Sequence, residues 1–181
     1  NRHLERTVEG LGRYLADGPP RMPVRYTLVG FGSEEELEAI RQAVRRHHLE
    51  HAVELRGRVA HDELPVLLAQ HNVGVAFTPL VPWFEHQPST KVFEYLHSGL
   101  LCVAVDTAAN RELICDRNGV LVADTPEAFA RGLERILELL PRWSPAAVAE
   151  TVRDLTWEWV VSETLVPLLE QVRRRAPVLG S

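Results

Sequence analysis

Short runs of apolar residues alternate with longer amphipathic segments along this 181-residue chain. Residues 73–77 (Val-Gly-Val-Ala-Phe) and 101–105 (Leu-Cys-Val-Ala-Val) are apolar at every position. Strands of this kind are buried on both faces, which is typical of a parallel sheet that helices cover on both sides. The pattern therefore predicts an α/β fold: a doubly wound, Rossmann-like parallel sheet of about five or six strands with helices on both faces.

Turn residues and helical periodicity place the other elements. β-rich runs predict further strands over residues 24–29, 53–56 and 120–122, and Ser33 with Glu36 predicts a capping box at the start of a helix. Helices are expected over about residues 2–16, from 126 to beyond 140, and over 145–153. We expect one domain over residues 1–181, closed by a helix over 155–175. In such a fold, ligands bind at the carboxyl ends of the strands.

Composition narrows the class of protein. The net charge of −5 argues against nucleic acid or an anionic membrane surface as the main partner. Cys102 and Cys115 form no C-x-x-C pair, which suits a reducing compartment and indicates a cytoplasmic protein. No apolar stretch approaches the roughly 18 residues of a membrane span. Because the chain begins at Asn1 and enters a helix pattern directly, we expect a fragment of a longer protein.

The segment 87–99, QPSTKVFEYLHSG, carries the strongest chemical signal. Lys91 is the single lysine of the chain, and Glu94 lies inside an otherwise apolar run. A helix that begins near Ser89 would place Thr90, Lys91 and Glu94 on one side, with its first N–H groups able to attract phosphate. Glu94, one turn further in, suits two vicinal hydroxyls such as those of a ribose. The alternative is an ordinary surface ion pair between Lys91 and Glu94.

The same region resembles a known family. The block FEHQPSTKVFEYLHSGLLCVAVDTAANRELICDRNGVLV resembles the donor-binding segment of the group 1 glycosyltransferases, family four of the two-domain GT-B fold. LVGFGSEEELEAI resembles the strand–Gly-x-Gly–helix unit of that family, and LTWEWVVSETLVPLLEQV resembles its closing helix. The resemblance implies the C-terminal donor domain of a retaining transferase. Such an enzyme takes a sugar from a nucleoside diphosphate sugar, and at family level it acts in cell-surface glycan synthesis.

Site residues follow from this resemblance position by position. Glu94 matches the second glutamate of the family's E-x7-E motif, which binds the ribose. The helix start at Ser89 and the residues Thr90, Lys91 and Val92 match positions that meet the diphosphate. Lys91, Arg2 and the helix terminus would neutralise charge as the glycosidic bond breaks.

Other matched positions lie outside this helix. Arg2 matches a basic residue that contacts the diphosphate in many members of the family. Arg58 and Val59 match the loop along the base, and Gly32 belongs to a tight turn near the nucleotide edge. The first motif glutamate is replaced: His86 stands eight residues before Glu94, with Glu85 one position earlier. Either residue is a candidate to touch the transferred sugar.

The resemblance also implies partners. We expect no metal and no other cofactor, because the chain contains no D-x-D motif. The acceptor site would come mainly from a missing N-terminal domain, and peripheral membrane association of the full-length protein stays open. Two alternatives remain: another sugar-nucleotide enzyme of the same fold, such as an epimerase or a phosphorylase, and a non-catalytic module that binds a protein partner through residues 79–88.

Overall fold

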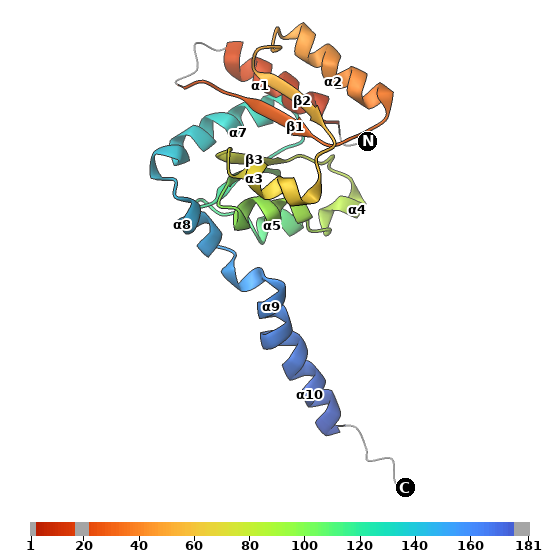
Figure 1. Ribbon diagram of the computed structural model, residues 1–181, viewed down its shortest axis with the longest axis vertical. Helices are drawn as coiled ribbons and strands as arrows, with labels where there is room; N and C mark the ends of the chain where they lie inside the picture. Colours follow the sequence, from red (N-terminus) through yellow and green to blue (C-terminus); the bar gives the residue numbers. More distant parts are fainter. Residues whose placement is uncertain (1–2, 17–21, 176–181) are drawn as a thin grey trace. The chain divides into compact units, whose positions relative to one another are not determined.

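The computed structural model describes residues 3–16 and 22–175, and the chain divides into two compact units, Asn1–Thr151 and Val152–Ser181. In chain order, the elements of the first unit are α1 (Glu5–Ala16), β1 (Tyr26–Val29), α2 (Glu34–Arg46), β2 (Val53–Gly57), the 3₁₀ turn η1 (His61–Glu63), α3 (Leu64–Leu68), β3 (Val73–Ala76), α4 (Pro82–Glu85), α5 (Thr90–His97), β4 (Leu101–Val105), α6 (Ala108–Arg111), β5 (Gly119–Val122), α7 (Pro126–Leu139), the 3₁₀ turn η2 (Leu140–Arg142) and α8 (Pro145–Glu150) (Figure 1).

All strand pairs in the described residues are parallel, which confirms the predicted α/β class. The strands form two sheets, β1-β2 and β3-β4-β5, so the single sheet of five or six strands is not present. The division falls between β1 and β3, which are each four residues long. Each of them pairs with its other neighbour along its length, but side chains and a cavity occupy the seam between the two.

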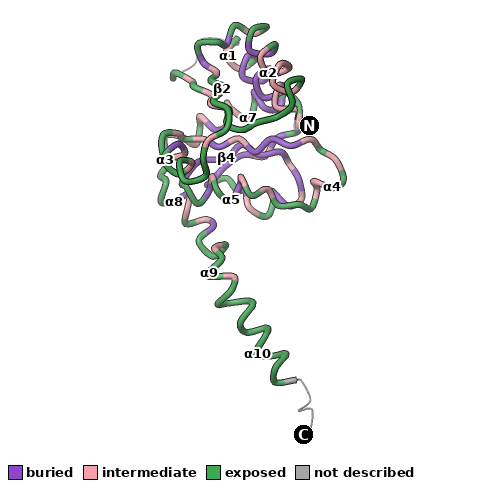
Figure 2. Tube along the Cα trace, turned by 45° about the vertical axis from the view of Figure 1, so that its right-hand side comes forward, coloured by how far each residue is buried: buried purple, intermediate pink, exposed green. Residues whose placement is uncertain are grey.

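The core is centred on β4, in which every residue is buried (Figure 2). Helix α7 covers β4 and β5. Its Phe129 meets Phe77 edge to face, with the ring centroids 5.8 Å apart. Such aromatic pairs contribute about 0.5–1.5 kcal/mol beyond the area they bury. The all-apolar sequence of β4 therefore reflects burial on both faces, as predicted.

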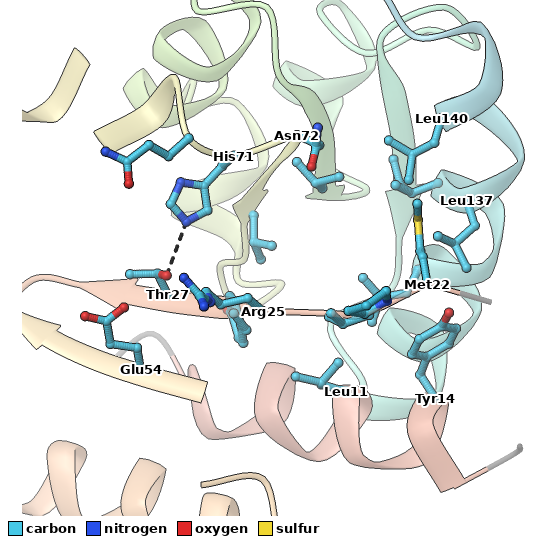
Figure 3. Close-up of a pocket in the computed structure, with 18 of the residues that line it drawn as sticks. Leu11, Tyr14, Met22, Arg25, Thr27, Glu54, His71, Asn72, Leu137 and Leu140 are labelled. Atoms are coloured by element: carbon cyan, nitrogen blue, oxygen red, sulfur yellow. Dashed lines mark hydrogen bonds between the residues drawn. The ribbon is translucent and has the colours of Figure 1, made fainter. Parts of the chain in front are cut away.

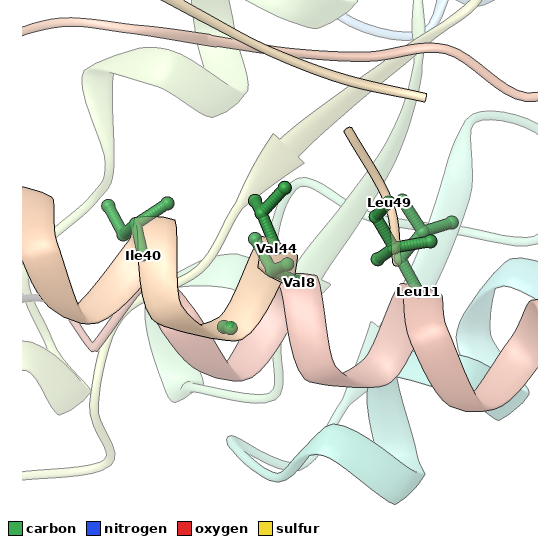
Figure 4. Close-up of a cluster of buried hydrophobic side chains, with 6 residues drawn as sticks. Val8, Leu11, Ile40, Val44 and Leu49 are labelled. Atoms are coloured by element: carbon green, nitrogen blue, oxygen red, sulfur yellow. The ribbon is translucent and has the colours of Figure 1, made fainter. Parts of the chain in front are cut away.

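A second cluster of buried side chains joins α1 to α2 (Figure 4). Val8 and Leu11 of α1 pack with Ile40 and Val44 of α2 and with Leu49. The other side of α1 packs on α7. There Gly10 permits a close approach, because a Cβ atom at this position would lie 2.6 Å from the carbonyl oxygen of Pro126.

The predicted capping box opens helix α2. The Glu36 N–H donates to Ser33 Oγ at 3.2 Å, and the Ser33 N–H donates to Glu36 Oε2 at 3.0 Å. These two bonds satisfy N–H groups that have no partner inside a helix. They also fix the turn that connects β1 to α2.

The second unit contains the 3₁₀ turn η3 (Arg153–Leu155), α9 (Trp157–Val160), the π-helical segment η4 (Val161–Leu165) and α10 (Val166–Arg175). These segments cover the range predicted as a closing helix. None of residues 153–174 is buried.

Candidate functional site

The candidate site lies where the two sheets meet. From β1 the chain moves outward to β2, and from β3 it moves the opposite way to β4 and β5. Thr27 of β1 and His71, two residues before β3, share a hydrogen bond of 3.2 Å between Oγ1 and Nε2, so the two strands lie side by side (Figure 3). In doubly wound sheets, ligands bind outside the carboxyl ends of the strands at such a topological switch point. The turn after Val29 and the loop 77–89 lie at these ends.

Helix α5 begins where the sequence predicts. It covers Thr90–His97, Ser89 is its N-cap, and the Ser89 side chain makes no capping hydrogen bond. The Val92 N–H donates to the Ser89 carbonyl at 3.0 Å, and the Val92 side chain is completely buried. Thr90 and Glu94 are exposed and Lys91 is half-buried. The helix therefore shows its predicted polar side to solvent and packs its apolar side inward.

Two features of the sequence fix the position of α5. Gly74 of β3 lies beneath Tyr95, and a Cβ atom at Gly74 would come within 2.2 Å of the Tyr95 ring. Burial raises the pKa of the Tyr95 hydroxyl. At the other end, the Gly99 N–H donates to the Leu96 carbonyl and the Leu100 N–H to the Tyr95 carbonyl, with Gly99 at φ +77°. This is a Schellman motif, and it turns the chain directly into β4.

Glu85 and His86, the two candidates for the first glutamate of the E-x7-E motif, have different surroundings in the structure. Glu85 is the last residue of α4, and its Oε1 accepts a hydrogen bond of 3.1 Å from the Ala108 N–H, at the start of α6. His86 follows as the C-cap of α4 and is exposed. One carboxylate oxygen of Glu85 is thus engaged within the fold, whereas the His86 side chain is accessible.

Asp124 holds the loop that leads to this site, a role that the sequence did not suggest. Its Oδ2 accepts a hydrogen bond of 3.0 Å from the Leu80 N–H and one of 3.2 Å from Arg6 Nη1. Arg6 Nη1 also donates to the Asp124 carbonyl at 2.9 Å. Asp124 therefore ties the loop 77–89 to α1. Its place before Thr125 and Pro126 signals a helix start in the sequence, which hides this second role.

The turn after β1 and the residue after β2 form a second group at the carboxyl edge. The Gly30 N–H donates to the Gly57 carbonyl at 2.8 Å, which links the ends of the two strands. The Arg58 guanidinium lies over the Phe31 ring, with its carbon 4.1 Å from the ring centroid. Gly32 lies against Glu36, because a Cβ atom there would meet Glu36 Oε2 at 2.6 Å. Val59, next to Arg58, is half-buried.

Arg2, the remaining predicted diphosphate ligand, lies outside the described residues. The next arginine along the chain is Arg6, and it binds Asp124.

A cavity of about 350 Å³ occupies the seam between β1 and β3 (Figure 3). Tyr14, Met22 and Leu140 line one part of it, and Glu54 and His71 line another. Its lining residues on β1 and β3 stop at residues 27 and 75, short of the carboxyl ends of both strands. None of the predicted donor-site residues that the structure describes lines this cavity, so it is distinct from the candidate site.

Neither a metal-binding cluster nor a membrane-spanning helix is present in the described residues. No group of three or more His, Cys, Asp or Glu side chains is arranged to hold a metal ion within residues 3–16 and 22–175. Over the same residues, none of the helices has both the length and the apolar character that crossing a bilayer requires.

The parallel strands, the switch point and the exposed start of α5 define a Rossmann-like α/β domain with a ligand crevice expected at its carboxyl edge. The family model described as glycosyl transferases group 1 matches residues 4–139. The chain therefore belongs to the group 1 glycosyl transferases, which confirms the resemblance seen in the sequence.

Solved structures agree with this fold. HepE (Alr3699) of Anabaena, in complex with UDP and glucose, has a TM-score of 0.71 and 19% identity over 94% of this chain and 45% of its own. Sucrose-phosphate synthase of Thermosynechococcus elongatus has a TM-score of 0.71 and 21% identity over 97% and 45%. The pneumococcal O-GlcNAc transferase GtfA, in complex with UDP and GlcNAc, has a TM-score of 0.71 and 18% identity over 94% and 33%.

The chain thus spans less than half the length of each of these proteins. No curated protein matches it.

Proposed function

We propose that this chain is the donor-binding part of a retaining glycosyltransferase that transfers a sugar from a nucleoside diphosphate sugar to an acceptor, in cell-surface glycan synthesis. The observation that carries the proposal is the exposed start of α5 beside the β1/β3 switch point, in a chain of the group 1 family. A separate domain supplies the acceptor site. The full-length protein works in the cytoplasm or at the inner face of the membrane.

The start of α5 receives the diphosphate. The first N–H groups of a helix point along its axis and favour an anion, and the Ser89 side chain does not cap them. Lys91 adds a positive charge in the first turn. When the glycosidic bond breaks, negative charge grows on the departing diphosphate. Donors that are already oriented toward that charge lower the barrier without a reorganisation cost.

Glu94 binds the ribose and His86 contacts the transferred sugar. Glu94 is one turn from the start of α5 and exposed, so its carboxylate can accept hydrogen bonds from two neighbouring hydroxyls. His86 is exposed on the loop before α5, whereas Glu85 already binds the Ala108 N–H. UDP is the nucleotide to test first, because HepE and GtfA were both solved in complex with UDP. We propose that the donor site uses no metal ion, because the chain contains no D-x-D motif.

The test compares UDP with pyrophosphate in the Glu94→Ala variant. A hydrogen bond to a charged group contributes about 1.5–3 kcal/mol, so UDP binding should weaken by about 10-fold or more. Pyrophosphate lacks the ribose, and its affinity should stay the same or rise, because a nearby negative charge is removed. Titration calorimetry of the purified 181-residue chain measures both affinities.

The matched control is Glu134→Ala, which removes an exposed carboxylate on α7. It should change neither affinity by more than about twofold. Equal losses of UDP and pyrophosphate binding in Glu94→Ala would reject the ribose role. Absence of nucleotide binding by the unmodified chain would reject the donor-site proposal and favour the protein-interaction alternative. Product analysis on the full-length enzyme separates transfer from epimerisation or phosphorolysis.

A further inference from the structure

Phe31 is a large apolar side chain in a position where the local fold does not need one. It lies in the turn after β1 and is 76% exposed. The backbone geometry of the turn depends on its two glycines and not on Phe31. Gly30 has φ +140°, and Gly32 lies against Glu36. An exposed phenylalanine adds nothing to the core. Its exposure just after the carboxyl end of β1, at the edge where ligands of such sheets bind, points to a ligand-facing role.

Hydrogen bonds hold the chain on both sides of Phe31, and one residue contacts its ring. The capping box of Ser33 and Glu36 fixes the chain immediately after Phe31, and the hydrogen bond from Gly30 to Gly57 fixes the chain before it. The Arg58 guanidinium lies over the ring at 4.1 Å, a cation–π contact. Since the side chain is still 76% exposed, the ring remains largely accessible to a second flat group.

The position of this pair also fits a nucleotide. Phe31 follows the carboxyl end of β1 by two residues, and Arg58 directly follows the carboxyl end of β2. Strands β1 and β2 are parallel neighbours, so both residues lie at the same edge of the sheet. The loop 77–89 and the start of α5 follow β3 on the other side of the switch point. Phe31 and α5 thus come from the two strands that flank the expected crevice.

We propose that Phe31 is the stacking platform for the nucleobase of the donor, with Arg58 holding the ring from its other face. The inference rests on the proposed donor-binding function and adds a base-binding residue to it. Every base has a π-face, so stacking contributes to affinity for all nucleotides and favours the larger purine surface modestly. The diphosphate and ribose contacts at α5 are independent of it.

The experiment measures binding of UDP, ADP and pyrophosphate to Phe31→Ala and Phe31→Trp. Base stacking on an aromatic side chain contributes a factor of about 5 to 150 to the affinity, which is lost when that side chain is truncated. Phe31→Ala should therefore weaken the binding of UDP and ADP by at least about fivefold and leave pyrophosphate binding unchanged, and Phe31→Trp, which keeps an aromatic ring, should retain the binding of both nucleotides. In NMR spectra, the base protons of bound UDP should show upfield ring-current shifts that Phe31→Ala abolishes.

Val66→Ala is the control, because Val66 is 66% exposed on α3 and its truncation should change none of the affinities. The stacking role is overturned if Phe31→Ala binds UDP within about twofold of the unmodified chain, or loses UDP and pyrophosphate equally. If Glu94→Ala weakens the binding of UDP while Phe31→Ala does not, the stacking inference fails and the donor-site proposal stands. If the unmodified chain binds no nucleotide, both fail.

Discussion

The Asp124→Ala substitution tests whether one carboxylate connects the candidate site to the N-terminal helix. In the structure, Asp124 Oδ2 accepts from the Leu80 N–H at 3.0 Å and from Arg6 Nη1 at 3.2 Å. Two hydrogen bonds to a charged group would contribute about 3–6 kcal/mol if both were fully buried. Leu80 is 43% exposed, and Arg6 keeps its bond to the Asp124 carbonyl at 2.9 Å, so water and the backbone replace much of what is lost.

We therefore expect Asp124→Ala to lower the free energy of unfolding by about 1–2 kcal/mol. For a chain of this size, that corresponds to a decrease of about 2–8 °C in the melting temperature. Asp124→Asn keeps an oxygen acceptor for the Leu80 N–H and should lose about half as much. Urea unfolding measures the difference, and the midpoint should change while the slope stays constant.

A double-mutant cycle with Arg6→Met isolates the ion pair: the double variant should lose less stability than the sum of the two single variants, and this difference should decrease with added salt. Asp116→Ala, which removes an exposed carboxylate, is the matched control. The reasoning is refuted if Asp124→Ala changes stability by less than about 0.3 kcal/mol, or if Asp124→Asn is as damaging as Asp124→Ala.

Two further predictions concern the core beneath α5. Gly74→Ala should lower the free energy of unfolding by about 1–3 kcal/mol, because the new Cβ atom would come within 2.2 Å of the Tyr95 ring. Urea unfolding measures this loss. Unchanged stability would show that Tyr95 can move aside. Native thiol labelling at pH 8 should modify Cys115, which is exposed, and spare Cys102, whose pKa burial raises to about 12. Mass spectrometry counts the labels, and rapid double labelling before unfolding would contradict the burial of Cys102.

The sequence predicted those features that depend on local pattern. The all-apolar run 101–105 is the buried strand β4, and Ser33 with Glu36 forms the capping box. The helix predicted from Ser89 is α5. In each case a few neighbouring residues are enough to predict the element. A strand buried on both faces requires apolar residues throughout, and a capping box requires a particular residue pair three positions apart.

Features that depend on distant contacts were not predictable in this way. The seam between β1 and β3 depends on how two four-residue strands meet across side chains from elsewhere in the chain. The contact of Asp124 with Leu80 spans 44 residues, and nothing near Asp124 distinguishes it from an ordinary helix-start residue. In the sequence, Glu85 and His86 are equivalent candidates to contact the transferred sugar. Only the hydrogen bond from the Ala108 N–H to Glu85, between residues 23 positions apart, distinguishes them.

The seam has a consequence for the candidate site. The proposed base platform, Phe31 with Arg58, belongs to the sheet β1-β2, whereas α5 packs on β3 and β4. Because the two sheets share no ladder in the described residues, other contacts must hold the two parts of the site in register. These contacts are the packing of α1 on α7, the Thr27–His71 hydrogen bond and the Asp124 contacts. A nucleotide that spans both sheets would add a further link, so its binding should stabilise the domain more than contacts to either sheet alone.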